Sequence, residues 1–196
     1  IDIIKTAHRV GLPTTSTIMF GHVENMSHVA DHLLKLLNIQ SDTNGITEFV
    51  PLPFVAEEAP IYRKGLARPG PTFKETILVH AVSRILFNQS INNIQGSWVK
   101  MGLPGLKFLL SAGINDVGGI LMNESITKSA GASFGQELNL ASVYEITNQL
   151  GLNLKQRNTL YEPIQNSLDT LIQAQPIPLQ PIVNEYHKPK QIINTL

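Results

Sequence analysis

The sequence has no cysteine among its 196 residues. It therefore offers no thiol for a disulfide, for a nucleophilic active site or for a cysteine-held iron–sulfur cluster. Fifteen basic and fifteen acidic residues cancel, so no excess positive charge favours binding to nucleic acid or to an anionic membrane surface. No apolar run reaches the length of about 18 residues that a membrane-spanning helix needs. These absences favour a cytoplasmic protein that binds neither nucleic acid nor a membrane.

The first residues, IDIIKTAHRVGLPTT, contain neither a methionine nor a targeting pattern. They read as the end of a helix followed by a strand, so we expect a fragment that starts inside a domain. With 42% hydrophobic and only 15% charged residues, the chain has enough apolar material for a sizeable core and for strands buried on both faces.

Short apolar runs alternate with helical patterns along the chain, which is typical of a parallel sheet with helices. Strands are expected at residues 14–20, 46–54, 91–101 and 114–122, and helices at residues 27–44, 72–88, 105–113, 142–152 and 156–174. Four strand–helix units correspond to half of an eight-stranded barrel. The expected fold class is therefore α/β: the C-terminal half of a (β/α) TIM-type barrel plus C-terminal helices. A doubly wound sheet is the alternative, but no strand is followed by the G-x-G-x-x-G of a dinucleotide-binding turn.

The division into parts follows from this pattern. Residues 1–135 would form the half-barrel, and residues 136–196 a helical segment with a proline-rich tail.

Polar residues follow the first expected strand. His22 and Glu24 come directly after it and would point toward the barrel mouth, where barrel enzymes place their active sites. His28 and His32 have the i, i+4 spacing of two metal ligands on one helix. They lie beside the apolar stripe of an outer helix, however, so a solvated helix face explains them better. We therefore expect no metal site in this chain.

Later segments are also candidates for binding. The long connection at residues 51–72 carries aromatic and cationic side chains that would suit a substrate lid. The segments GGILMNES and GASFGQ place small residues where a substrate could come close. His80 lies inside an apolar helix and is interpreted as a core histidine, whereas Trp98 suits a core position or a stacking surface equally. The lid candidates are Phe54, Tyr62, Arg63, Lys64 and Arg68.

Five segments together resemble one enzyme family: TTSTIMFGHVE, FVPLPF, RKGLARPGPTF, NIQGSWVKMG and GGILMNESITKSAGASFGQ. In this order they resemble the C-terminal part of radical S-adenosylmethionine (radical SAM) enzymes. Within that family the match is closest to the tyrosine-using subunits of deazaflavin (7,8-didemethyl-8-hydroxy-5-deazariboflavin) synthase. The resemblance implies that residues 1–135 contain strands five to eight of a radical SAM barrel.

The resemblance also implies a reaction. The enzyme would join the 4-hydroxybenzyl group of L-tyrosine to 5-amino-6-(D-ribitylamino)uracil, a transfer that belongs to coenzyme F420 biosynthesis. Its cofactors would be S-adenosylmethionine and a [4Fe-4S] cluster held by a CxxxCxxC motif outside this chain. A companion radical SAM synthase subunit would act on the product. This chain alone would be inactive, because it has no cysteine for the cluster.

Site residues follow from the same resemblance, which assigns no catalytic residue. The implied cofactor-binding residues, near the adenosyl group and adenine, are Gly21, His22, Glu24, Pro51 and Leu52. The implied substrate-binding residues are Asn115, Asp116, Asn123, Glu124 and Ser125. The family usually has an acidic residue at position 123 and a histidine at position 134. Asn123 and Phe134 depart from this pattern, which leaves their roles open.

Two other functions stay open. A menaquinone-pathway futalosine radical SAM enzyme would share the GHVE and PLPF-like segments. A cluster-free barrel remnant would bind a partner or a small molecule without catalysis.

Overall fold

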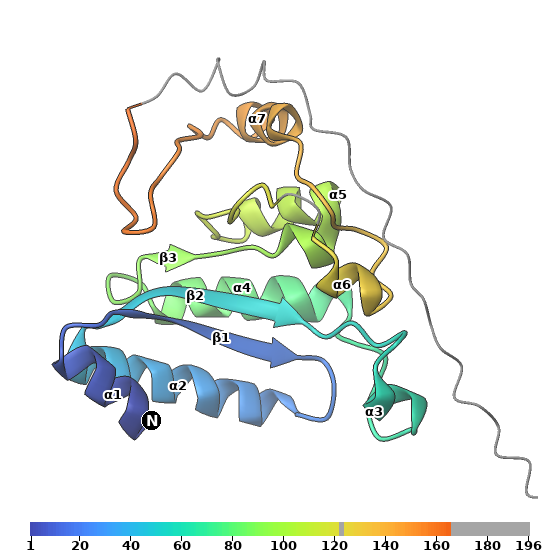
Figure 1. Ribbon diagram of the computed structural model, residues 1–196, viewed down its shortest axis with the longest axis horizontal. Helices are drawn as coiled ribbons and strands as arrows, with labels where there is room; N and C mark the ends of the chain where they lie inside the picture. The colour runs from blue at the N-terminus through green and yellow to red at the C-terminus, as the bar shows by residue number, and fades with distance from the viewer. Residues whose placement is uncertain (122–123, 166–196) are drawn as a thin grey trace, which may run out of the picture.

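A computed structural model describes residues 1–121 and 124–165 (Figure 1). Its sheet has three parallel strands in the order β1-β2-β3. The strands are β1 (Thr14–Phe20), β2 (Ile46–Pro53) and β3 (Asn93–Ile94). The helices are α1 (Asp2–Arg9), α2 (Met26–Thr43), α3 (Pro60–Arg63), α4 (Phe73–Leu86), α5 (Trp98–Ser111), α6 (Ile126–Ser129) and α7 (Leu140–Gln149).

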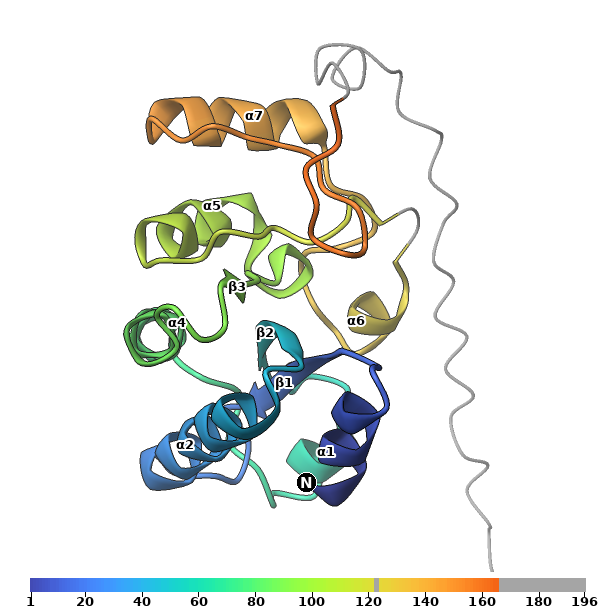
Figure 2. The same cartoon turned by 90° about the vertical axis from the view of Figure 1, so that its left-hand side faces the viewer.

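One face of the sheet is covered by helices. Figure 2 shows α2, α4, α5 and α7 following one another along one side of the strands. Ile18 and Phe20 of β1 are buried toward this side, as is Phe49 of β2. The Phe49 ring meets Phe87 at the end of α4 edge to face, with 5.1 Å between ring centres. The apolar stripe of α2 and the β-branched strand residues therefore build the core that the sequence indicates.

The opposite face of β1 is open. Thr15, Thr17 and Met19 alternate with the buried residues and are exposed, Met19 to 53%. β1 is also an edge strand, since it pairs only with β2 among the described residues. The described residues thus form a partial α/β fold with helices along one side of a small parallel sheet, and they do not close a barrel.

Parts of the expected pattern are wrong. The strand expected at residues 114–122 is absent from its described residues, where Asp116 forms only an isolated bridge with Gln95. The strand expected at 91–101 is reduced to the two residues of β3, because α5 already begins at Trp98. The helix expected at 156–174 is not helical over residues 156–165, and its remainder lies outside the described residues.

Short-range signals set the helix ends. α2 begins one residue before the expected Ser27, because the side chain of Asn25 accepts a hydrogen bond from the backbone N–H of His28 at 3.1 Å. It ends at Asn44, whose left-handed φ of 50° stops the helix. α4 starts with a capping box between Thr72 and Glu75. These ends fix where the loops that carry the site begin.

The structure shows where the His80 and Trp98 side chains lie. His80 is fully buried in α4, as predicted, and its Nδ1 lies 2.8 Å from the backbone oxygen of Thr76. Trp98 is 5% exposed, and its Nε1–H donates to the backbone oxygen of Gly119 at 3.0 Å. Trp98 is therefore a core residue that anchors the 114–121 segment.

Acid should destabilise the protein through His80. Burial lowers the pKa of His80 to about 4 from the ordinary 6.5, although its hydrogen bond to Thr76 opposes the shift. Between these two pKa values the unfolded chain binds more protons at His80 than the folded chain does. The contribution of the neutral His80 to the free energy of unfolding is therefore complete above pH 6.5 and is lost as the pH falls toward 4. The loss should be about 3 kcal/mol. Urea unfolding at pH 7 and pH 4.5 measures it.

A matched pair of variants isolates this effect. His80→Leu should flatten the dependence of the unfolding free energy on pH, whereas His28→Leu, at an exposed position of α2, should leave it as in the parent. Equal pH dependence in the parent and in His80→Leu would show that the imidazole is not the group responsible.

Candidate functional site

The loop after β1 is organised around the carboxylate of Glu24. The backbone N–H groups of Gly21 and His22 donate to it at 2.6 and 3.1 Å, and Nδ1 of His22 lies 2.6 Å from its Oε2. Burial alone would raise the pKa of Glu24, but the backbone N–H groups of Gly21, Glu24 and His22 lower it to about 2. Glu24 is therefore an anion at any physiological pH. It holds the loop in a fixed shape.

Arg68 ties this loop to the long connection after β2. Its guanidinium lies 3.3 Å from Glu24 and 2.7 Å from Glu75, the capping residue of α4. Its backbone N–H donates to the backbone oxygen of His22 at 2.9 Å. Arg68, one of the residues expected in a lid, thus fastens residues 68–71 across the carboxyl ends of β1 and β2. Residues 68–71 form a strap over these strand ends.

Two glycines let the strap lie against the strand ends. A Cβ on Gly21, which has a φ of +98°, would come within 2.1 Å of Cδ of Pro71. A Cβ on Gly70, at φ +100°, would come within 2.7 Å of the backbone oxygen of Phe54. The group that approaches Gly21 closely, and so requires a glycine there, is therefore Pro71 of this chain.

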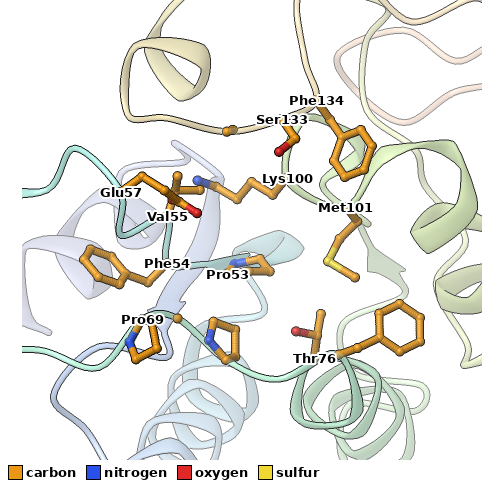
Figure 3. Close-up of a pocket in the computed structure, with 14 residues that line it drawn as sticks. Pro53, Phe54, Val55, Glu57, Pro69, Thr76, Lys100, Met101, Ser133 and Phe134 are labelled. Atoms are coloured by element: carbon orange, nitrogen blue, oxygen red, sulfur yellow. The ribbon is translucent and has the colours of Figure 1, made fainter. Parts of the chain in front are cut away.

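A cavity of about 290 Å³ lies beside this strap, at the carboxyl end of β2 (Figure 3). Its walls come from the end of β2 and the following loop, from the starts of α4 and α5, and from the GASFGQ segment. The lining residues are Pro53, Phe54, Val55, Glu57, Pro69, Gly70, Pro71, Phe73, Thr76, Lys100, Met101, Ala132, Ser133 and Phe134.

The kink in α5 shapes one wall of the cavity. Gly102 interrupts the helix with a φ of 62° and a ψ of 178°. A Cβ at this position would come within 2.7 Å of the Phe134 ring. The kink thus lets the aromatic ring of the GASFGQ segment pack against α5, next to Lys100 and Met101.

Two residues of opposite charge line the cavity. Lys100 is half-buried, and burial lowers the pKa of its ammonium group, although the charge of Glu124 opposes the shift. Glu57 is exposed and stands on the loop after β2. Figure 3 shows Lys100 and Glu57 extending toward one another from opposite walls. Such a cavity suits a ligand with an aromatic part and a charged part.

Of the ten residues that the resemblance implies, none of the nine that the structure describes lines this cavity. Gly21 lies next to the lining residues Gly70 and Pro71, and Pro51 is fully buried in the core before the lining begins at Pro53. His22 is closer, because its partly exposed ring lies 5.5 Å from the ring of the lining residue Phe54. Leu52 pairs with Met19 on the open side of the sheet.

The implied substrate residues are spread over several places. Oδ1 of Asn115 accepts from the backbone N–H of Ile94 and from Arg84, at 2.9 and 2.7 Å. Its side chain therefore fastens α4 to β3. Asp116 forms an ion pair with Arg157.

Of the three other implied residues, Glu124 and Ser125 lie directly before α6. Glu124 accepts from the backbone N–H of Thr127 at 2.9 Å with one oxygen, while its buried Oε2 has no hydrogen-bond partner among residues 1–121 and 124–165. Ser125 is exposed at the start of α6. Asn123 lies outside the described residues.

A buried polar cluster was missed from the sequence. Glu48 of β2 is 3% exposed and accepts hydrogen bonds from Gln95 and from the Tyr161 hydroxyl, at 3.2 and 3.1 Å. Arg157 lies 3.6 Å from Glu48 and also pairs with Asp116. A charged residue in the middle of an apolar strand was the only local signal of this cluster, because its partners come from far along the chain.

No metal site appears in the described part of the chain, where no three potential His, Cys, Asp or Glu ligands gather. His28 is exposed, and His32 is half-buried against Phe49, with 6.5 Å between ring centres. Within the described ranges no helix is both long and apolar enough to cross a bilayer.

Comparison with known proteins gives the family. The family described as the CofH/MqnC C-terminal region matches residues 43–170, more than half of the chain. The chain belongs to the CofH/MqnC C-terminal region family. The match contains the cavity and the strap, and it begins after the GHVE loop.

Curated relatives of this CofH/MqnC chain carry two names. It is 49% identical over 162 residues to a 5-amino-6-(D-ribitylamino)uracil–L-tyrosine 4-hydroxyphenyl transferase of Methanopyrus kandleri, which covers 83% of the chain and 44% of the relative. A transferase of the same name from Methanocaldococcus jannaschii is 48% identical over 162 residues, covering 83% of the chain and 45% of the relative. FO synthase of Nocardia farcinica is 48% identical over 161 residues, covering 82% of the chain and 19% of the relative. The chain thus spans less than half the length of each of these relatives.

Proposed function

We propose that this chain is the C-terminal half of a radical SAM barrel, with strands five to eight of that barrel and the helices that follow them. In the whole protein, this barrel would transfer the 4-hydroxybenzyl group of L-tyrosine to 5-amino-6-(D-ribitylamino)uracil, a step of deazaflavin biosynthesis. The observation that carries the proposal is the similarity to transferases of that name over most of the chain.

The shape of the sheet supports the half-barrel. Its strands are parallel, its helices follow one side, and the other side of β1 carries the exposed Thr15, Thr17 and Met19. The strap and the cavity both lie at the carboxyl ends of the strands, where barrel enzymes bind their substrates. On this proposal residues 1–135 form the half-barrel, and residues 136–196 are an appended C-terminal segment.

The residues of the chain fit one of the two expected cofactors. Without cysteine the chain supplies no thiolate for a [4Fe-4S] cluster, so the cluster ligands would lie outside these residues. The partly exposed rings of His22 and Phe54, 5.5 Å apart at the strand ends, fit the adenosyl group of S-adenosylmethionine. Bound together, cluster and S-adenosylmethionine would supply the radical that takes a hydrogen atom from tyrosine.

The role of each implied residue then differs. Gly21 and Glu24 would fix the loop that presents His22, and the backbone of Pro51 and Leu52 would lie near adenine. Of the substrate candidates, we favour Glu124, because one of its carboxylate oxygens has no hydrogen-bond partner among the described residues and its charge acts on the lining residue Lys100. Asn115 and Asp116 would act indirectly, without binding the substrate, since their side chains already bind Arg84 and Arg157. We propose Asn123 and Ser125 only through the resemblance.

The partners of the whole protein would be the two substrates and a companion radical SAM synthase subunit that receives the product. The similarity to an FO synthase of which the chain covers only 19% supports the companion, because that relative has room for a second enzyme in one chain. We place the protein in the cytoplasm.

Formation of 5′-deoxyadenosine tests the function. The whole protein, with its cluster reconstituted under anaerobic conditions, should release 5′-deoxyadenosine when tyrosine is added and should not release it without tyrosine. A futalosine-type substrate should not replace tyrosine. If 5′-deoxyadenosine forms only with the futalosine-type substrate, the protein is the menaquinone-pathway enzyme that the family description also covers. If it forms with neither substrate, the barrel is a non-catalytic remnant.

A further inference from the structure

Lys100 is a cation in the wall of the cavity. It stands near the start of α5 and is half-buried, and its ammonium group forms no hydrogen bond or ion pair with any residue in 1–121 or 124–165. Burial deprives its ammonium group of water and lowers its pKa, while the negative charge of Glu124 opposes that shift. A poorly hydrated ammonium gains more from binding an anion than an exposed one does. Lys100 therefore suits an anionic group that enters the cavity.

Glu57 stands across the cavity from Lys100. Figure 3 shows the two side chains extending toward one another from α5 and from the loop after β2. No ion pair joins them in the described part of the chain, so their charged groups are more than the 4.0 Å of an ion pair apart. Two opposite charges separated in this way match a ligand that carries both a carboxylate and an ammonium group.

The remaining walls are apolar and aromatic. Phe54, Phe73 and Phe134 contribute rings and Met101 a thioether, and both kinds of group pack well against another aromatic ring. The cavity volume of about 290 Å³ lies just below the range for small-molecule sites, roughly 300–1,000 Å³. It suits a single amino acid better than a larger ligand.

We propose that this cavity binds an aromatic amino acid as a zwitterion, with Lys100 holding its carboxylate, Glu57 its ammonium group and the aromatic wall its ring. The identification of that amino acid as L-tyrosine rests on the proposed function. Neither Lys100 nor Glu57 is among the residues that the family resemblance implies, and both follow from the geometry of the cavity alone.

Ligands that lack one charge test the two contacts separately. Binding to the whole protein would be measured by calorimetry for tyrosine, for tyramine, which lacks the carboxylate, and for 3-(4-hydroxyphenyl)propanoate, which lacks the ammonium group. The parent should bind tyrosine roughly 10- to 100-fold more tightly than either analogue, because each loses a charged hydrogen bond.

Variants assign each loss to one residue. Lys100→Met should bind tyrosine and tyramine about equally, whereas Lys100→Arg should restore the preference for tyrosine. Glu57→Gln should lose the preference for tyrosine over 3-(4-hydroxyphenyl)propanoate and keep the preference over tyramine. Lys107→Met is the matched control, because Lys107 lies on the exposed side of the same helix and bonds Gln149 at 2.8 Å. It should behave as the parent.

Several results would overturn the inference. One is a Lys100→Met variant that still prefers tyrosine to tyramine while folded by circular dichroism. Another is a Lys100→Met variant that loses affinity for S-adenosylmethionine instead, which would place the methionine part of that cofactor in the cavity. If the parent makes the joined product but Lys100→Met binds tyrosine unchanged, only the inference fails. If the parent binds no tyrosine at all, the proposed function fails with it.

Discussion

Replacing Gly21 with alanine should lower the free energy of unfolding by roughly 3–5 kcal/mol. Gly21 has a φ of +98°, which an L side chain rarely adopts, and its new Cβ would lie 2.1 Å from Cδ and 2.3 Å from N of Pro71. The contact is with a proline ring and its backbone nitrogen, which cannot rotate away. Relief therefore requires the strap to leave the strand ends, which would also loosen the contacts between Arg68 and Glu24.

Gly11 provides the control for this substitution. It has a similar φ of +82°, but no atom lies within 4 Å of the position of its Cβ. Gly11→Ala should show the backbone strain alone, about 1–2 kcal/mol. Melting temperatures of the two variants of the whole protein make the comparison. Equal losses at both positions would mean that Pro71 does not press on Gly21.

Arg157→Met should destabilise the protein by about 3 kcal/mol near pH 8. Arg157 lies between Glu48 and Asp116, whose side chains are 4% and 10% exposed. Removing the guanidinium leaves two neighbouring carboxylates buried with only hydrogen-bond donors to compensate them. The Tyr161 ring would also lose the guanidinium that stacks 4.2 Å from its centre.

The loss should depend on pH in a defined direction. Burial, and then the charge of Asp116, already raise the pKa of Glu48 above its ordinary 4.5, while Tyr161 and Arg157 oppose the rise. Without Arg157 the folded state should hold a proton on Glu48 more strongly than the unfolded state does. The destabilisation should therefore be greatest above the folded pKa and should shrink as the pH falls toward 4.5.

Two further variants control this experiment. Adding Glu48→Gln to Arg157→Met should recover much of the stability, because it removes one of the two buried charges. Arg9→Met changes an exposed arginine at the end of α1 and should have little effect. If the double variant were no more stable than Arg157→Met, the lost packing of Arg157 would explain the effect better than the charges.

The sequence predicts the parts of the fold that local patterns determine. The apolar, β-branched run at 14–20 becomes β1 with its bounds unchanged, and the helix expected at 72–88 becomes α4 at Phe73–Leu86. His80 lies in the core as its apolar neighbours indicate. In each case the signal comes from residues a few positions apart, where periodicity and capping act.

Long-range contacts explain what the sequence did not predict. The apolar residues from Ile114 look like a strand, but their backbone pairing stops at the isolated bridge between Asp116 and Gln95. Beyond that bridge, the Trp98 indole donates to the backbone oxygen of Gly119. Glu48 and Arg157 are far apart in the chain and meet only after folding.

The site residues that the resemblance implies stay predictions, but the structure shows where the candidate segments lie. Two predicted features were located: the GHVE loop, at the strand ends, and the GASFGQ segment, which lines the cavity. The sequence does not distinguish the cations of the site: Arg68, a lid candidate, binds Glu24 and Glu75, whereas Lys100 of the segment NIQGSWVKMG lines the cavity. Which cation is paired and which is free depends on three-dimensional neighbours that the sequence does not reveal.

Transfer of a labelled ring tests the proposed function most directly. The whole protein would be incubated anaerobically with S-adenosylmethionine, 5-amino-6-(D-ribitylamino)uracil and tyrosine carrying ¹³C in its aromatic ring, and the products would be separated by mass. The proposed function predicts one product that contains the labelled 4-hydroxybenzyl group joined to the ribitylaminouracil. Cleavage of S-adenosylmethionine with all of the label left in tyrosine would contradict it.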